Sequence, residues 1–199
     1  MNVLHVGPKN YPPAHGGIEK IVFDIVGRIE GVVSYVFVEW KQPENEKIKT
    51  LPKGILRQIR FILSFVKKNK IDLVHFHKEA FIPHALCKSL SGQKTILTLH
   101  GCAWRIKRWA WYYRLAFYIL DILACIIVPK VVFVGKEDHR HFSKLIFWRK
   151  LYYVPNGIKA NSLICSDDTS KCVFIGRISP EKNILKLITM FSTGDKKLT

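Results

Sequence analysis

The sequence opens with MNVLHVGPKNYPPAHGGIEK, residues 1–20, and this stretch decides the fold. Its first seven residues, MNVLHVG, include the apolar Val3, Leu4 and Val6 and end at Gly7, which predicts a strand. A proline-containing loop follows, and Gly16 and Gly17 open GGIEKIVFDIVGRI (16–29), whose apolar residues recur at helical spacing. A strand, a glycine loop and a helix in this order make the first half of a βαβ unit.

The rest of the chain repeats this alternation. Further strands are expected at 34–40, 71–77, 94–100, 130–135 and 151–158, and further helices at 55–70, 81–90, 108–127 and 136–146. Strands that alternate with helices predict an α/β, Rossmann-like parallel sheet with helices on both faces.

The domain organisation follows from a change in composition. The run ANSLICSDDTS (160–170) is polar and lacks periodicity, which is typical of a linker. We therefore expect a Rossmann-like domain at 1–158, a linker at 159–170, and at 171–199 a single βα unit that begins a second, incomplete domain.

The positive charge is concentrated in the middle of the chain. Residues 51–150 hold 19 Lys and Arg against 5 Asp and Glu, which is +14 of the total net charge of +17. Such a concentration implies an anionic partner. No helix-turn-helix, RRM, KH or zinc-finger signature is present, so we do not expect nucleic acid to be that partner.

A membrane surface is the alternative anionic partner. The helix expected at 55–70 has an apolar, core-facing stripe (Ile55, Leu56, Ile59, Ile62, Leu63, Val66) and a basic opposite face, and RIKRWAWYYR (105–114) joins basic residues to aromatic ones. These features suit anionic lipid headgroups, although a solvated basic face has the same pattern. In 109–134, Arg114, Asp121 and Pro129 interrupt the apolar run, so we expect a buried helix and a strand there, not a membrane span.

The cysteines and the N-terminus indicate the compartment. The five cysteines are widely spaced without a CxxC pair, and the first residues lack the features of a secretory signal. Both observations favour a reducing, cytoplasmic setting.

Two features predict ligand chemistry. The Gly16–Gly17 loop lies where helix N–H groups can meet a phosphate, although a loop without a ligand has the same spacing. His100 ends a predicted strand, which puts it at the carboxyl edge of the sheet with the glycine loop. His75 and His77 share one face of a strand, and His77 either joins that edge or is packed. No Cys or carboxylate partners accompany the histidines at compact spacing, so no metal site is predicted.

Several motifs then coincide in order: HGGIEK, IDLVHFH, LTLHG, VVFVGKED, YVPNGI and FIGRISPEKN. This ordered set resembles the GT4-type retaining glycosyltransferases of the GT-B fold. The resemblance covers nearly the whole chain but only the first half of a family member. It implies an acceptor-binding N-terminal domain that faces a donor-binding C-terminal domain, with a nucleotide-sugar as the donor and no metal cofactor.

The resemblance also implies site residues. Gly16 and Gly17 would meet the donor diphosphate, His100 would lie near the transferred sugar, and Arg177 and Lys182 would grip the diphosphate from the second domain. An arginine, a lysine and backbone N–H groups suit the charge that grows on a leaving nucleoside diphosphate.

The family's later acidic motif, two glutamates separated by seven residues, has no counterpart before residue 199. We therefore expect an incomplete donor site and no activity of this chain alone. The expected function is sugar transfer to a lipid-linked glycan or surface-polysaccharide acceptor at the cytoplasmic membrane face. Two alternatives remain: a subunit of a split enzyme, completed by a partner chain with the donor domain, or a non-catalytic module that binds membrane or acceptor.

Overall fold

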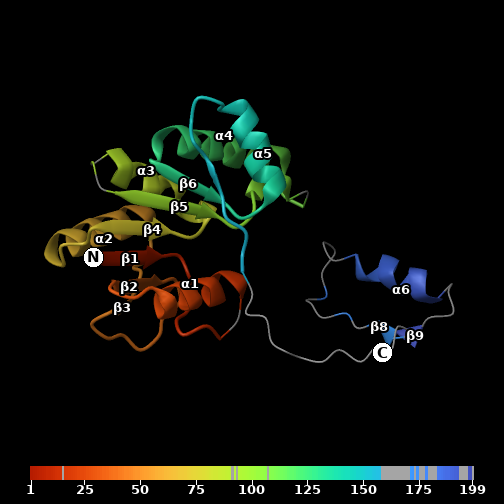
Figure 1. The fold of residues 1–199 in the computed structure, drawn as a ribbon, viewed down its shortest axis with the longest axis horizontal. Helices are drawn as coiled ribbons and strands as arrows, with labels where there is room; N and C mark the ends of the chain where they lie inside the picture. The colour runs from red at the N-terminus through yellow and green to blue at the C-terminus, as the bar shows by residue number, and fades with distance from the viewer. Residues whose placement is uncertain are drawn as a thin grey trace. The chain divides into compact units, whose positions relative to one another are not determined.

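The computed structural model describes residues 1–14, 16–90, 92, 94–106, 108–157, 171, 172, 174, 178, 183–192, 197 and 198. The chain divides into two compact units, Met1–Gly157 and Ile158–Thr199 (Figure 1). The predicted linker at 159–170 lies outside the described residues. That residues 171–199 begin a donor-binding domain stays a prediction.

The first unit is built on a parallel sheet of seven described strands. Their order is β3-β2-β1-β4-β5-β6-β7, and every neighbouring pair is parallel. The strands are β1 (Asn2–Val6), β2 (Val33–Val38), β3 (Ile48–Thr50), β4 (Leu73–Phe76), β5 (Thr95–Leu99), β6 (Lys130–Phe133) and β7 (Tyr152–Tyr153). The predicted α/β, Rossmann-like parallel sheet is confirmed.

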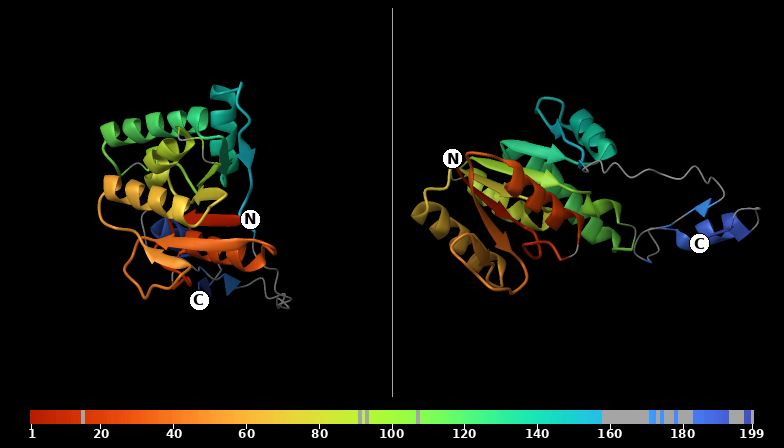
Figure 2. Two further views of the ribbon diagram at one scale, coloured as in Figure 1. Left: turned by 90° about the vertical axis from the view of Figure 1, so that its left-hand side faces the viewer. Right: turned by 60° about the horizontal axis from the view of Figure 1, so that its bottom comes forward.

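Helices cover both faces of this sheet (Figure 2). Helix α1 (Gly17–Arg28) packs on one face, where Val22 contacts Val36 and Val38. The opposite face is covered by α2 (Ile55–Lys68), α3 (Ile82–Leu90), α4 (Trp111–Ile127) and α5 (Lys136–Leu145). Two short 3₁₀ turns, Glu79–Phe81 and Ala103–Arg105, follow β4 and β5.

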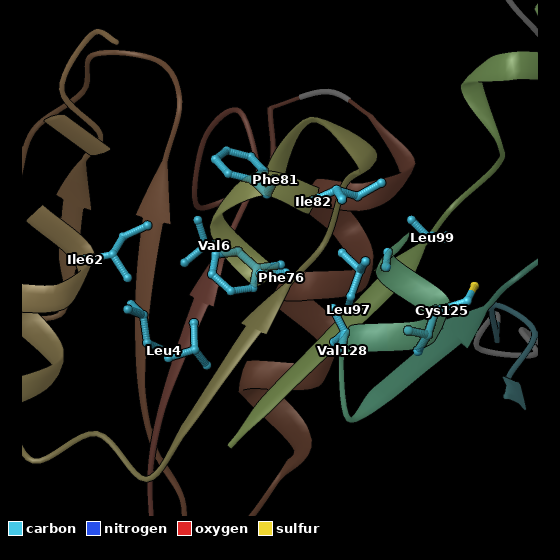
Figure 3. Close-up of a cluster of buried hydrophobic side chains, with 14 of the residues drawn as sticks. Leu4, Val6, Ile62, Phe76, Phe81, Ile82, Leu97, Leu99, Cys125 and Val128 are labelled. Atoms are coloured by element: carbon cyan, nitrogen blue, oxygen red, sulfur yellow. The ribbon is translucent and has the colours of Figure 1, made fainter. Parts of the chain in front are cut away.

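The main core lies between the sheet and the helices α2 to α5 (Figure 3). Leu4, Val6 and Phe76 point from the strands toward Ile62 of α2 and Ile82 of α3. Successive side chains alternate between the faces of a strand, so the residues between these apolar ones face α1. That parity puts His5 and His75 on the α1 face.

The apolar stripe of α2 lies differently from the prediction. Ile62 and Val66 are buried, but Ile55, Leu56 and Leu63 are exposed, Leu56 by 73%. Phe61 and Phe65 take the core side instead, because both rings pack on Phe37 of β2, with ring centroids 5.0 and 4.8 Å from it. Because these large rings face the sheet, a different side of the helix is buried than predicted. Leu56 and Leu63 therefore lie on the exposed, basic side.

Helix α4 also differs from the buried helix expected at 108–127. Asp121, Ala124 and Cys125 are buried, while an apolar stripe with 3–4 residue spacing is exposed: Tyr112, Leu115, Ile119, Leu123 and Ile126. Among the described residues, no helix combines the length and apolar character needed to cross a bilayer. The sequence also failed to predict β3, which is three residues long and follows a polar run.

The second unit is described in part. It contains α6 (Ile184–Ser192) and two short parallel strands, β8 (Lys171–Cys172) and β9 (Lys197–Leu198).

Candidate active site

The glycine loop between β1 and α1 is shaped by a carboxylate. Gly16 precedes α1 with φ of +99°, a conformation that favours glycine. A side chain at Gly16 would collide with the carboxylate of Glu19, which is buried in the first turn of α1. The same carboxylate accepts a hydrogen bond from the backbone N–H of Lys9 at 2.9 Å. Glu19 thus ties both ends of the loop together.

Gly17 has a different environment. A Cβ at this position would meet no atom within 4 Å, so packing does not require glycine here. Gly17 is the first residue of α1, where backbone N–H groups lack partners within the helix. The end of α1 therefore offers donors beside open space, which suits a phosphate.

His100 lies directly after β5, at the same carboxyl edge. Burial lowers its pKa to about 4, and the nearby Glu19 carboxylate opposes this shift. Neither ring nitrogen has a hydrogen-bond partner among the described residues. The imidazole is therefore uncharged at neutral pH and can donate or accept a hydrogen bond.

A second group of histidines lies beneath α1. His5 Nδ1 and His77 Nε2 are 3.1 Å apart, and His75 Nε2 is 2.7 Å from Thr98 Oγ1. Burial lowers the pKa of His5 to about 4 and of His75 to about 3, and it lowers that of His77 well below its usual range. All three rings are neutral at physiological pH. Sequence reasoning paired His75 with His77 but missed His5, which is 70 residues away from His75.

Ion pairs order the other loops of this edge. Arg105, after β5, forms an ion pair with Asp138 of α5, with 2.6 Å between Nε and Oδ1, and its guanidinium stacks on the Trp104 ring. Lys78, after β4, pairs with Glu39, after β2. The first pair joins the turn after β5 to the start of α5, and the second joins the segments after β4 and β2, so the carboxyl edge around His100 is held by several elements.

A hollow lies beside the glycine loop. It has a volume of about 660 Å³ and is lined in part by Asn10, Tyr11, Trp40 and Gln42. Gln42 donates to the backbone carbonyl of Tyr11 at 2.7 Å and accepts from its N–H at 3.0 Å, which fixes the hollow's wall. The exposed Trp40 ring and neighbouring amides are the groups that usually contact sugars. Nothing in the sequence alone pointed to this hollow.

Of the residues named from the sequence, Gly16, Gly17 and His100 gather at the carboxyl edge, linked through Glu19. Arg177 and Lys182 lie outside the described residues.

Comparison with known proteins adds the family. The family model described as Glycosyltransferase Family 4 matches residues 16–162, which include Gly16, Gly17, His75, His77 and His100. No curated protein matches the sequence. The matched segment is most of the chain, and its parallel sheet is consistent with the N-terminal half of a GT-B enzyme. The chain therefore belongs to Glycosyltransferase Family 4.

Proposed function

We propose that the protein is a retaining glycosyltransferase that transfers a sugar from a nucleotide-sugar to a glycan or lipid-linked acceptor at the cytoplasmic membrane face. The observation that carries this proposal is the pairing of the open α1 N-terminus with an uncharged His100. The first suits the diphosphate of a donor, and the second suits the hydroxyl groups of a sugar.

The chemistry needs charge stabilisation more than proton transfer. As the glycosidic bond breaks, negative charge grows on the leaving nucleoside diphosphate. N–H groups at Gly16 and Gly17 would stabilise this charge, because the fold already points them at the proposed position of the diphosphate before the reaction begins. Arg177 and Lys182 are proposed as the partners from the second unit, and no metal is required. His100 would position the transferred sugar through a neutral hydrogen bond.

The acceptor is proposed to enter through the hollow beside Trp40. An aromatic ring can pack against the apolar face of a sugar, while Asn10 and Lys41 offer polar groups to its hydroxyls. The glycine loop forms one wall of this hollow through Asn10 and Tyr11. An acceptor bound there would therefore lie next to the loop that meets the donor.

The outer surface of α2 and α4 supports a membrane-bound acceptor. Arg57, Arg60, Lys67 and Lys68 are exposed on α2, and Leu56 and Leu63 lie among them. Both helices cover the same face of the sheet, and α3 contacts each of them. Basic residues beside exposed apolar and aromatic side chains are typical of proteins that bind anionic lipid surfaces.

A transfer assay tests the proposal. The full chain is incubated with a panel of nucleotide-sugars and with anionic vesicles that carry lipid-linked acceptors, alone and with membrane extract that supplies a partner chain. Mass spectrometry then follows nucleoside diphosphate release and the glycosylated lipid. We expect product with at least one donor, and a large loss with His100→Ala but not with His139→Ala.

Two results would contradict the proposal. One is the absence of product from every donor in both arms. The other is equal activity of the wild type and His100→Ala. Vesicle or acceptor binding without any interaction with nucleotide-sugars would instead favour a non-catalytic binding module.

A further inference from the structure

Three imidazoles lie where the fold elsewhere places aliphatic side chains. On the α1 face of the sheet, the row of register partners runs Val36, His5, His75, Ile96. His77 follows His75 by two residues on the same face and is fully buried. A buried polar group without enough partners is costly, and the Nδ1 atom of His77 has no partner among the described residues.

The three rings converge on a small volume. His5 and His75 are register partners on adjacent strands, and His77, directly after β4, has its ring centroid 3.8 Å from that of His75. One ring nitrogen from each histidine lies within 4.8 Å of the others, and the His5 Nδ1–His77 Nε2 pair is 3.1 Å apart. Two nitrogens bound tetrahedrally to one zinc ion, at about 2.0–2.1 Å each, are roughly 3.3 Å apart. The His5–His77 pair is already close to this separation, and the His75 ring, which has a nitrogen within 4.8 Å of the other two, would rotate toward them to match.

We propose that His5, His75 and His77 bind one divalent transition-metal ion, with zinc as the expected occupant. Three neutral imidazoles suit zinc, and a fourth position would be left for water. The ion would join β1 to β4 beneath α1. This site goes beyond sugar transfer: it takes no part in binding the diphosphate, and the proposal does not depend on the identity of the donor.

Thr98 provides the outer support that such a ligand needs. Its Oγ1 lies 2.7 Å from His75 Nε2, so it can accept the N–H of that ring and leave Nδ1 for the metal. Ligating histidines usually donate their second ring N–H in this way, which fixes both tautomer and ring orientation. Gly7 lies beside the backbone of His77, where a Cβ would stand 3.4 Å from the His77 nitrogen and from the Phe81 ring, so β1 and the residue after β4 approach closely.

Metal binding to the full chain tests the site. Purified protein is treated with a chelator, dialysed, and titrated with Co²⁺, a spectroscopic substitute for zinc, and with Zn²⁺ in competition. We expect one equivalent of Co²⁺ with the intense visible bands of a tetrahedral site, displaced by Zn²⁺. His5→Gln and His77→Gln should each weaken binding by more than about 100-fold, and Thr98→Val by roughly 10–100-fold.

His84→Gln is the matched control, because His84 is also buried but lies on α3, on the other face of the sheet. It should bind Co²⁺ like the wild type. His139→Gln, at a half-buried histidine of α5, controls for binding at histidines outside the cluster. The site is overturned if the wild type binds no Co²⁺, if binding survives both His5→Gln and His77→Gln, or if it is lost in a control.

A second measurement covers variants that fail to fold. X-ray absorption at the zinc edge counts the ligands of the wild-type protein directly. Three imidazole nitrogens at about 2.0 Å support the site. Fewer than three imidazoles, or sulfur in the first shell, overturn it, since no cysteine belongs to the cluster.

Discussion

Gly16 and Gly17 are adjacent, yet the fold places different demands on them. Gly16 needs a positive φ and has the Glu19 carboxylate where a side chain would begin, so it serves the structure of the loop. Gly17 faces open space and serves no packing role. Gly16 is therefore needed for stability and Gly17, as proposed, for ligand binding, a difference that the GG motif in the sequence does not reveal.

Gly16→Ala should lower the free energy of unfolding by about 1–3 kcal/mol from the unfavourable backbone conformation alone. Movement of the Glu19 carboxylate should add to this loss. Urea denaturation measures this loss. Because part of the cost is the clash with Glu19, the same substitution should cost less in a Glu19→Ala background. Equal costs in both backgrounds would show that Glu19 does not occupy this space.

Gly17→Ala should keep or raise stability, since alanine in a helix is favoured over glycine by about 0.5–1 kcal/mol. The new methyl group stands where a diphosphate would approach, so nucleotide-sugar affinity should fall about tenfold, or 1.4 kcal/mol. Calorimetric titration and urea denaturation measure the two effects. Unchanged affinity would remove Gly17 from the binding site.

His84 makes stability depend on pH. Burial between Phe76 and Phe81 lowers its pKa to about 4. The unfolded state, with a pKa near 6.5, therefore binds a proton that the folded state does not, and stability falls as pH drops from about 6.5 toward 4. His84 should account for a loss in the free energy of unfolding on the order of 1–2 kcal/mol between pH 6.5 and 4.5. His84→Leu should reduce the pH slope of urea denaturation; an unchanged slope would contradict the assignment.

At the residue scale, the sequence identified the carboxyl-edge position of His100 from its place at the end of a predicted strand in a parallel sheet. It could not identify His5 as a neighbour of His75. That contact depends on β1 and β4 being adjacent in register, and strand order is set by packing of the whole sheet.

At the scale of elements, the periodic patterns predicted every helix of the first unit within a few residues. They did not predict which arc of each helix is buried. In α2 the rings of Phe61 and Phe65 outweigh Leu56 and Leu63, and in α4 an apolar stripe remains uncovered. Apolar periodicity on two sides of a helix is ambiguous until its neighbours are known.

The basic face of α2 should govern binding to anionic membranes. The double variant Arg60→Gln and Lys67→Gln should weaken binding to phosphatidylserine vesicles by about 2 kcal/mol, or roughly 30-fold, at about 1 kcal/mol per basic residue. Vesicle co-sedimentation measures this. The matched control is Lys20→Gln with Arg28→Gln on α1, which covers the opposite face. An equal loss in both double variants would leave only a general effect of net charge.

At the scale of the whole molecule, the alternation of strands and helices predicted the parallel α/β sheet, and the structure confirms it. The order of the strands in the sheet could not be predicted from the sequence. Of the two edge strands, β3 was missed because it has three residues, whereas β7, expected at 151–158, was predicted but forms over only two residues. Such short strands carry no periodicity and form only because β2 and β6 offer unpaired edges.

The first unit contains the whole seven-stranded sheet and both hydrophobic clusters. Residues 1–157 should therefore fold without the remainder. Circular dichroism of this fragment should show a cooperative thermal transition whose midpoint lies within a few degrees of the full chain's. A broad, non-cooperative transition would mean that the second unit supplies part of the core.

The central claim is that a nucleotide-sugar binds at the carboxyl edge, beside His100 and the N-terminus of α1. Its most direct test is a titration of the full chain with nucleotide-sugars, followed through the histidine ring signals in NMR spectra. The account predicts that at least one donor shifts the His100 signals saturably, leaves those of His84 unmoved, and binds more weakly to Gly17→Ala. If no donor shifts the His100 signals, either with the chain alone or after addition of a partner chain that supplies the donor domain, or if saturable shifts arise only elsewhere, the claim is wrong.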